Sequence, residues 1–244
     1  MRSIKARSYL AKSPFLWQKQ ALVFWERNLI EVGDAMTPSK DIDGASLQAL
    51  AKPVDRLVDT ARQLFCKNGI AATGIQEVLA ASDVSRMTLY NNFGSKQALV
   101  IAALEKEGKE WREWFFHRIE RSGSTPLSRL SNIFAVLEEW FSQADYYGCG
   151  FINAIAGGSR DDHEIRSLAM AHKGELKGFL RHLAHDAGIG DEEQFIEQLI
   201  LLIDAAIVCR LTNPRTSLRQ PSERLLSIMI EAHGFGCDEE SDAA

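Results

Sequence analysis

The stretch from residue 53 to residue 99 constrains the fold more than any other, because it contains several helix signals separated by very short turns. Its first apolar residues repeat with the period of an α-helix and predict an amphipathic helix that ends near Gly69. Ser85 has the position of a helix N-cap, and Ser95 has that of the next one. Only residues 81–84 separate the second predicted helix from the third. This spacing predicts a helix-turn-helix unit.

The second helix and the turn that follows it each have a local signal. Thr73 and Gln76 are spaced as a capping box, which predicts that Thr73 opens this helix. Asp83 occupies the turn, and aspartate tolerates a left-handed backbone better than most residues. The apolar side chains of this part of the chain are expected to form the core of a small domain. They are Leu79, Val84, Leu89 and Phe93.

The same residues resemble the DNA-binding domain of TetR-family transcription regulators. The resemblance covers about a fifth of the chain, from Leu57 to Leu99. It lies in Leu64-Phe65 before Gly69, in Ile75-Gln76-Glu77-Val78 after Thr73, in Val84-Ser85, in Thr88-Leu89-Tyr90, in Phe93 and in Ser95-Lys96. The chain departs from the family at Asp83, where glycine is usual, and at Met87, where a small residue is frequent.

A recognition helix in the major groove presents its N-terminal residues to base edges, which makes four residues candidate base readers. They are Ser85, Arg86, Met87 and Tyr90. Arg86 is the strongest candidate because its guanidinium can donate to two acceptors at once. Met87 either meets a thymine methyl group or packs on its neighbours. Phosphate contacts are expected from Thr73, Thr88, Tyr90, Asn91, Asn92 and Lys96, with a helix cap or a solvated face as the alternative for each. The resemblance implies the same phosphate role for Thr73, Tyr90 and Lys96.

Charge is distributed unevenly along the 244 residues, whose formal net charge is −5. Residues 1–53 hold eight Lys or Arg against five Asp or Glu, residues 54–96 hold five against four, and residues 97–244 hold fifteen against twenty-four. The acidic C-terminal part is therefore expected to stay away from DNA. The helix-turn-helix unit is only weakly basic, which predicts modest non-specific affinity unless two copies act together or the N-terminal arm helps.

The four cysteines have no metal-binding spacing, and reduced, mostly buried thiols are expected, with a redox-sensing Cys149 as the alternative. No apolar run reaches the ~20 residues needed to span a bilayer, so a cytoplasmic protein without a membrane partner is expected.

Four segments are predicted: an extension over 1–50, the helix-turn-helix domain over 51–97, a regulatory and dimerisation domain over 98–236 and an acidic tail over 237–244. The extension is a disordered basic arm, an extra helix or an artefact of start assignment.

From Ser95 onward every signal is helical. One long helix is expected from Ser95 to about Arg121, leading from the helix-turn-helix unit into the next domain. Pro126 suits the first turn of another helix, expected to end near residue 144. Further helices are expected over 151–156, 162–187, 195–211 and 221–233. The predicted fold class is all-α, with an N-terminal three-helix helix-turn-helix domain joined by a long helix to a helical ligand-binding and dimerisation domain.

The resemblance extends more weakly to residues 148–153 and implies a C-terminal domain that binds a small molecule and pairs two chains through its last two long helices. The candidate ligand-site residues, with simple core packing as the alternative, are Trp114, Phe134, Leu137, Trp140, Phe141, Phe151, Asn153 and His172. The candidate dimer residues, on helices with surplus apolar surface, are Phe195, Leu199, Leu202, Ile203, Ala206, Leu225 and Ile228.

A search for dinucleotide-binding, P-loop, zinc-protease and nucleophile-elbow motifs finds none, so an enzyme is not expected, and neither a cofactor nor a metal. The predicted function is a sequence-specific DNA-binding transcription regulator, a homodimeric repressor relieved by a small molecule. Its expected partners are a palindromic DNA duplex, a second copy of the chain and an unidentified effector. The alternative is a helical protein-interaction module that has lost DNA binding.

Overall fold

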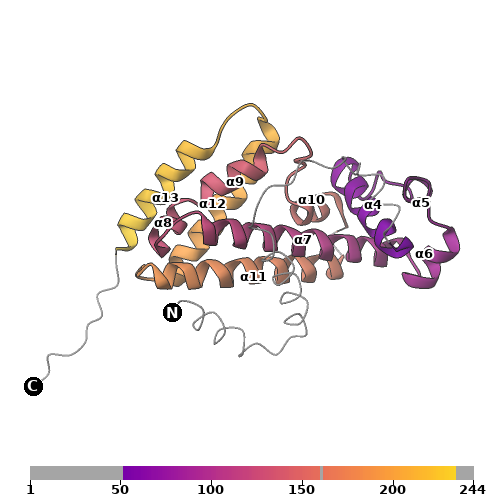
Figure 1. Ribbon diagram of the computed structural model, residues 1–244, viewed down its shortest axis with the longest axis horizontal. Helices are drawn as coiled ribbons and strands as arrows, with labels where there is room; N and C mark the ends of the chain where they lie inside the picture. The colour runs from indigo at the N-terminus through magenta and orange to yellow at the C-terminus, as the bar shows by residue number, and fades with distance from the viewer. Residues whose placement is uncertain (1–51, 160–161, 235–244) are drawn as a thin grey trace, which may run out of the picture. The chain divides into compact units, whose positions relative to one another are not determined.

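The computed structural model describes residues 52–159 and 162–234, and every regular element within them is an α-helix (Figure 1). The all-α prediction is therefore confirmed for this part of the chain. The predicted N-terminal extension and the acidic tail lie outside the described residues.

The first three helices form the helix-turn-helix unit. They are α4 (Pro53–Asn68), α5 (Ile75–Ser82) and α6 (Arg86–Asn92), and α4 packs against both of the others. Helix α4 buries Leu57, Ala61 and Phe65, the apolar face that the sequence predicted. It ends where expected, at Gly69, whose φ of 86° favours glycine.

Helix α7 (Lys96–Arg121) is the long element that the sequence predicted. Ser95 caps it by accepting a hydrogen bond from the backbone N–H of Ala98 at 3.1 Å. Its N-terminal half packs on α4, and its C-terminal part contributes Phe115 and Ile119 to the core of the larger helical body. Figure 1 shows α7 running beside α11 (His163–Asp186), and the two helices pack together.

The single helix expected after Pro126 is instead two, α8 (Pro126–Ser131) and α9 (Ile133–Phe141), so this prediction is wrong. Asn132 separates them with φ −88° and ψ 3°, outside the helical region. Its side-chain amide donates to the carbonyl oxygen of Ser122 at 2.6 Å. This bond ties the break to the end of α7, a partner ten residues away that local periodicity does not reveal.

Helix α10 (Gly150–Gly157) lies between the helix-turn-helix unit and the larger body, packing on α4, α7 and α11. Its close approach to α7 depends on Gly108, because a Cβ atom there would stand 2.8 Å from two ring carbons of Phe151. Any side chain at residue 108 would therefore force the ring of Phe151 to move.

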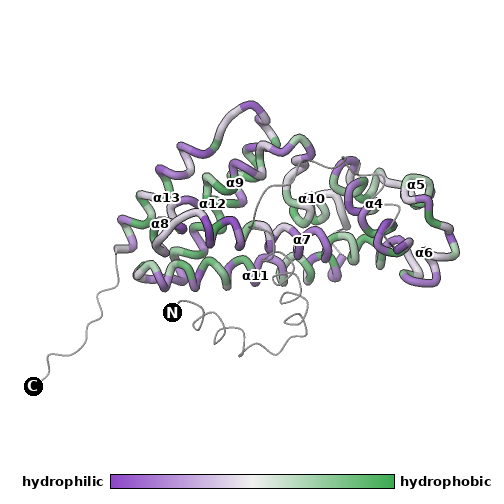
Figure 2. The backbone as a smooth tube through the Cα atoms, viewed as in Figure 1, coloured by the Kyte–Doolittle hydropathy of each residue, from purple (hydrophilic) through white to green (hydrophobic). Residues whose placement is uncertain are grey.

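The last two helices are α12 (Glu192–Thr212) and α13 (Arg219–His233), and α12 packs on both α11 and α13. A row of α11 cations meets a row of α12 carboxylates, including Lys177 with Glu197 and Arg181 with Glu193. Hydrophobic and hydrophilic residues alternate along α11 in Figure 2, as in a helix with one buried face. Between residues 52 and 234, leaving out 160–161, no helix combines the length and apolar character that a membrane span requires.

Candidate nucleic-acid interface

The turn between α5 and α6 depends on one left-handed residue. Asp83 has φ 51° and ψ 47°, the conformation that the sequence predicted for it. Arg56 of α4 donates from Nε to the carbonyl oxygen of Ser82 at 3.4 Å and from Nη2 to that of Asp83 at 3.3 Å. These bonds hold the end of α5 on α4 and so fix the direction in which α6 leaves the turn.

Helix α6 begins with the cap that the sequence predicted. Ser85 Oγ accepts a hydrogen bond from the backbone N–H of Thr88 at 3.1 Å and lies 2.9 Å from Thr88 Oγ1. At the other end of the helix, Asn92 Nδ2 donates to the carbonyl oxygen of Thr88 at 2.7 Å. The polar groups of Ser85, Thr88 and Asn92 thus have partners within the helix, while fully buried Leu89 anchors it to the core.

The remaining residues of α6 present free surface. Met87 is 73% exposed and Tyr90 is 47% exposed, and Arg86 and Asn91 are exposed as well. The exposure of Met87 contradicts the alternative in which it packs on its neighbours. Four candidate contact residues therefore share the outer side of one short, capped helix.

Thr73 is a correction to the sequence-based prediction. Its side chain is fully buried, and its hydroxyl lies 2.8 Å from the carbonyl oxygen of Gly69 and 3.3 Å from that of Leu64. The N-cap of α5 is Gly74, so the predicted capping box is wrong. Thr73 secures the α4–α5 loop, and its hydroxyl is not presented to a phosphate.

Lys96 also supports this loop. Its Nζ donates to the carbonyl oxygen of Ile70 at 2.8 Å, and its side chain is half-buried at the start of α7. An ammonium group has three donors, so this bond leaves capacity for a phosphate oxygen. Lys96 therefore remains a candidate for a phosphate contact. It also joins the start of α7 to the loop after α4.

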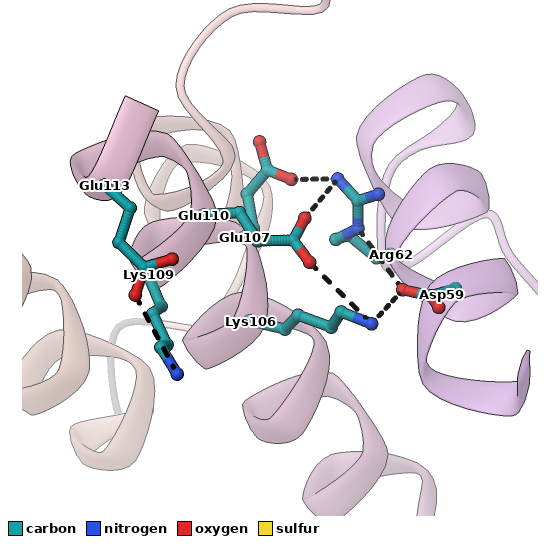
Figure 3. Close-up of polar contacts among 7 residues, drawn as sticks. All are labelled: Asp59, Arg62, Lys106, Glu107, Lys109, Glu110 and Glu113. Atoms are coloured by element: carbon teal, nitrogen blue, oxygen red, sulfur yellow. Dashed lines mark hydrogen bonds and ion pairs between the residues drawn. The ribbon is translucent and has the colours of Figure 1, made fainter. Parts of the chain in front are cut away.

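The helix-turn-helix unit is joined to α7 by a cluster of charged side chains, drawn in Figure 3. Arg62 Nη1 of α4 lies 2.8 Å from Glu107 Oε2 and 3.6 Å from Glu110 Oε2, both on α7. In the opposite sense, Lys106 of α7 pairs with Asp59 of α4. Asp59, Arg62, Lys106, Glu107 and Glu110 form this junction cluster. In it each helix contributes a cation that pairs with a carboxylate of the other helix.

Three of the predicted ligand-site residues line one pocket among α7, α9, α10, α11 and α12. They are Trp140, Phe151 and His172, and Trp111 joins them. The rings of Phe151 and His172 stack with centroids 4.3 Å apart, and those of Trp111 and Trp140 meet edge to face at 5.3 Å. About 370 Å³ of space lies between these residues if open solvent is counted, and the part wide enough for a water molecule is small, about 20 Å³. Trp111 was not among the ligand-site residues that the sequence predicted.

Two buried polar groups of this pocket differ in their hydrogen bonding: His172 has a partner within the described part of the chain and Trp111 does not. Burial, helped by the positive charges of Arg112 and Lys173, lowers the pKa of His172 to about 3. The imidazole is therefore neutral, and its Nδ1, 2.7 Å from Arg112 Nη1, accepts that hydrogen bond. Trp111 Nε1 is buried without a hydrogen-bond acceptor among the described residues.

The other predicted ligand-site residues lie elsewhere. Phe134 and Leu137 are fully buried, and Phe141 is nearly so; all three belong to the hydrophobic core. Asn153 donates to the carbonyl oxygen of Tyr147 at 2.7 Å and lines a second pocket, beside Arg62 and Cys66. Trp114 is half-buried and packs against the core. None of these five lines the pocket of Trp140, Phe151 and His172.

Burial raises the pKa of the Cys66 thiol to about 12, and it also raises that of Cys149, so both are protonated near neutral pH. This disfavours the redox-sensing alternative for Cys149, because the thiolate is the reactive form. In the described ranges, 52–159 and 162–234, no group of three or more His, Cys, Asp and Glu side chains could hold a metal ion.

The predicted dimer residues divide into two groups. Phe195, Leu199 and Ile203 are fully buried within the chain, Ala206 is 5% exposed and Leu202 is half-buried. The four buried residues cannot provide a free surface, so the prediction is wrong for them, whereas Leu202 is only partly covered. Leu225 and Ile228 are 50% and 53% exposed. On α12 the exposed large apolar residues are others: Leu201 at 69%, Val208 at 44%, about two turns further on, and Leu211 at 38%.

Residues 57–103 match the family model described as "Bacterial regulatory proteins, tetR family". This segment of the chain is therefore similar to the DNA-binding domain of tetR-family regulators. The transcriptional repressor DhaR of a Mycobacterium species is 29% identical over 93 residues, which cover 38% of this chain and 46% of that protein. The transcriptional regulator QacR of Staphylococcus aureus is 30% identical over 88 residues, which cover 36% of this chain and 47% of that protein. The chain thus spans about half the length of these two relatives.

Solved structures extend the similarity to the fold. A TetR-family transcriptional regulator of Streptomyces coelicolor aligns with a TM-score of 0.63 at 22% identity, covering 74% of this chain and 93% of that one. At this identity the likeness establishes the arrangement of helices alone. The helices of the larger body are therefore arranged as in that structure, in agreement with the predicted all-α fold.

Proposed function

We propose that the protein is a homodimeric, ligand-responsive repressor that binds a palindromic DNA operator. The observation that carries the proposal is the outer side of α6, where Arg86, Met87, Tyr90 and Asn91 are exposed on a capped helix whose buried anchor is Leu89. A short rigid helix with this distribution suits insertion into the major groove. The match of residues 57–103 to the tetR family, and a relative named as a transcriptional repressor, support the same function.

The exposed apolar residues of α12 and α13 support pairing of two copies. Leu201 and Val208 lie on one side of α12, and Leu225 and Ile228 on one side of α13. The two helices pack together, so both stripes can contribute to one surface. Four such helices across a two-fold axis form a bundle, and a two-fold dimer matches a palindromic duplex.

The pocket of Trp111, Trp140, Phe151 and His172 supports a small-molecule effector. Its aromatic rings provide apolar contact, and the unpaired N–H of Trp111 suits an acceptor atom on the ligand. Phe151 belongs to α10, which also packs on α4. A ligand that moved Phe151 would therefore act on the helix that supports α6, and such a ligand would lower operator affinity if it favoured the moved state.

The test is selection of duplexes from a random pool by the full-length protein, followed by affinity measurements at several salt concentrations. A palindromic sequence whose affinity falls steeply with salt is expected. Arg86→Ala should relax the sequence preference, Lys96→Ala should weaken all sequences alike, and Arg121→Ala, at the far end of α7, serves as the control. Retention of the same duplexes by all four proteins would contradict the proposal.

The alternative is a helical interaction module without DNA binding. The same selection discriminates, because such a module enriches no sequence above the starting pool. Its retention on duplex DNA would also be indifferent to Arg86→Ala.

A further inference from the structure

Met87 is the most exposed large apolar residue of the helix-turn-helix unit, at 73%. An exposed thioether contributes nothing to the core of this unit, which is built from residues such as Leu57, Val78 and Leu89. Its position on α6 is also central. Leu89, the buried anchor, is two residues away, or about 200° around a helix of 3.6 residues per turn. Met87 therefore points almost directly away from the core.

The polar side chains near Met87 differ in whether they form hydrogen bonds within the helix. Ser85, Thr88 and Asn92 use theirs within the helix. Asn91, four residues after Met87, shares its side of the helix and is exposed. The centre of the outer face is thus one aliphatic side chain followed, one turn on, by one amide.

Each of these groups matches a specific feature of the major groove. The only methyl group there belongs to thymine, and apolar side chains contact it. A side-chain amide pairs with the N6 and N7 atoms of adenine. Four residues of helix span about 6 Å, close to the rise of two base pairs. An aliphatic centre flanked by an amide is complementary to a stretch that contains A·T pairs, whereas guanine offers only polar acceptors to it.

We infer that Met87 reads the C5-methyl group of a thymine in each half-site of the operator, an inference that rests on the proposed DNA binding. The contact buries an apolar group that water would otherwise surround. It therefore adds discrimination between thymine and every base that lacks the methyl group, without any hydrogen bond.

Deoxyuridine is the direct probe, because it pairs as thymine does and lacks only this methyl group. Duplexes selected by the full-length protein are resynthesised with each thymine replaced in turn, symmetrically in both half-sites. At one position the wild-type affinity should fall by about fourfold per half-site, the ratio for burial of one methyl-sized group. Met87→Ala should bind the thymine duplex more weakly and lose its sensitivity to deoxyuridine at that position alone. Met170→Ala, at an equally exposed methionine of α11, is the matched control and should behave as wild type.

The outcomes separate the inference from the proposed function. Failure to select any duplex would remove the proposed function and this inference with it. Specific binding without thymine in the half-site, or with no sensitivity to deoxyuridine, would overturn the inference and leave the proposed function standing. Sensitivity that persists unchanged in Met87→Ala would do the same. Circular dichroism of each variant checks that the helices are intact.

Discussion

At the scale of single residues, His172 shows how burial sets a charge state. Its imidazole is 5% exposed, stacked on Phe151 and within hydrogen-bond distance of Arg112, which also pairs with Glu175 at 3.0 Å. Burial is the largest cause that disfavours a charged imidazole here, and the positive charge of the neighbouring guanidinium disfavours it as well. The native state therefore holds His172 neutral well below the pH at which a free histidine is protonated.

This predicts a pH dependence of stability. Above pH 6.5 His172 is neutral in both native and unfolded states and contributes no pH dependence. As the pH falls below 6.5 the unfolded chain binds a proton that the native chain, with its pKa of about 3, does not. Between pH 8 and pH 5 this group should cost about 2 kcal/mol of unfolding free energy. Urea denaturation of wild type and His172→Gln over this range measures the difference.

The glutamine variant can still accept the hydrogen bond of Arg112 and cannot titrate. Its stability should therefore fall less steeply as the pH is lowered, whatever its absolute value at pH 8. Parallel curves for the two proteins would show that His172 is protonated in the native state.

Residue-level predictions from the sequence succeeded where the signal was local. Ser85 and Ser95 are caps because their oxygens reach a backbone N–H three residues away, and Asp83 is left-handed because a tight turn requires it. Thr73 misled because its hydroxyl turns back to Gly69 and Leu64, residues that precede it. Only the folded loop shows that this side chain faces inward.

At the scale of elements, the junction cluster of α4 and α7 fixes how the helix-turn-helix unit sits on the long helix (Figure 3). Arg62 is its centre, since it faces Asp59, Glu107 and Glu110. Its side chain is 26% exposed and that of Glu107 is 21% exposed, so water screens their attraction only partly. Removing the guanidinium would leave a half-buried carboxylate without its closest cation.

Arg62→Ala should therefore lower the unfolding free energy by about 1–2 kcal/mol, less than for a fully buried pair. Thermal or urea denaturation at low and high salt measures the loss. Lys109→Ala, which removes an exposed partner of Glu113 on the same helix, is the control and should change stability by less than about 0.5 kcal/mol. Equal effects of the two changes would mean that the junction cluster has no special role.

The element boundaries show the limit of periodicity. The apolar residues of α8 and α9 keep a helical repeat through Asn132, so the sequence predicts one helix where there are two. The break depends on Ser122, whose carbonyl oxygen binds the amide of Asn132 from the end of α7. Such a long-range partner leaves no mark on the local pattern.

At the scale of the whole molecule, the question is which apolar surface faces the chain itself and which faces a partner. Helix α12 is apolar on most of its circumference, and the sequence alone cannot divide it. The fold divides it, with Phe195, Leu199 and Ile203 inside and Leu201 and Val208 outside. The sequence correctly indicated the two helices that leave apolar surface exposed. It named exposed residues on α13, Leu225 and Ile228, but mostly buried ones on α12.

Leu201→Glu should therefore convert the proposed dimer to a monomer, because it puts a charge at the most exposed residue of the apolar stripe of α12. Sedimentation velocity of the full-length protein reports the mass, and affinity for a selected duplex should fall with it. Met170→Glu, at a residue 75% exposed on α11, should leave both unchanged. A wild-type chain that sediments as a monomer, or a Leu201→Glu variant that stays dimeric, would contradict this dimer surface.

The shared helix α7 also bears on how such a protein can be rearranged by recombination. Its 26 residues supply Leu99 and Ala103 on the side where it packs against α4, and Phe115 and Ile119 to the opposite end of the body. A cut at the apparent domain border near residue 97 would strip apolar partners from both pieces. An exchange that gave this body a new operator preference would therefore have to import the first half of α7 together with the helices that precede it.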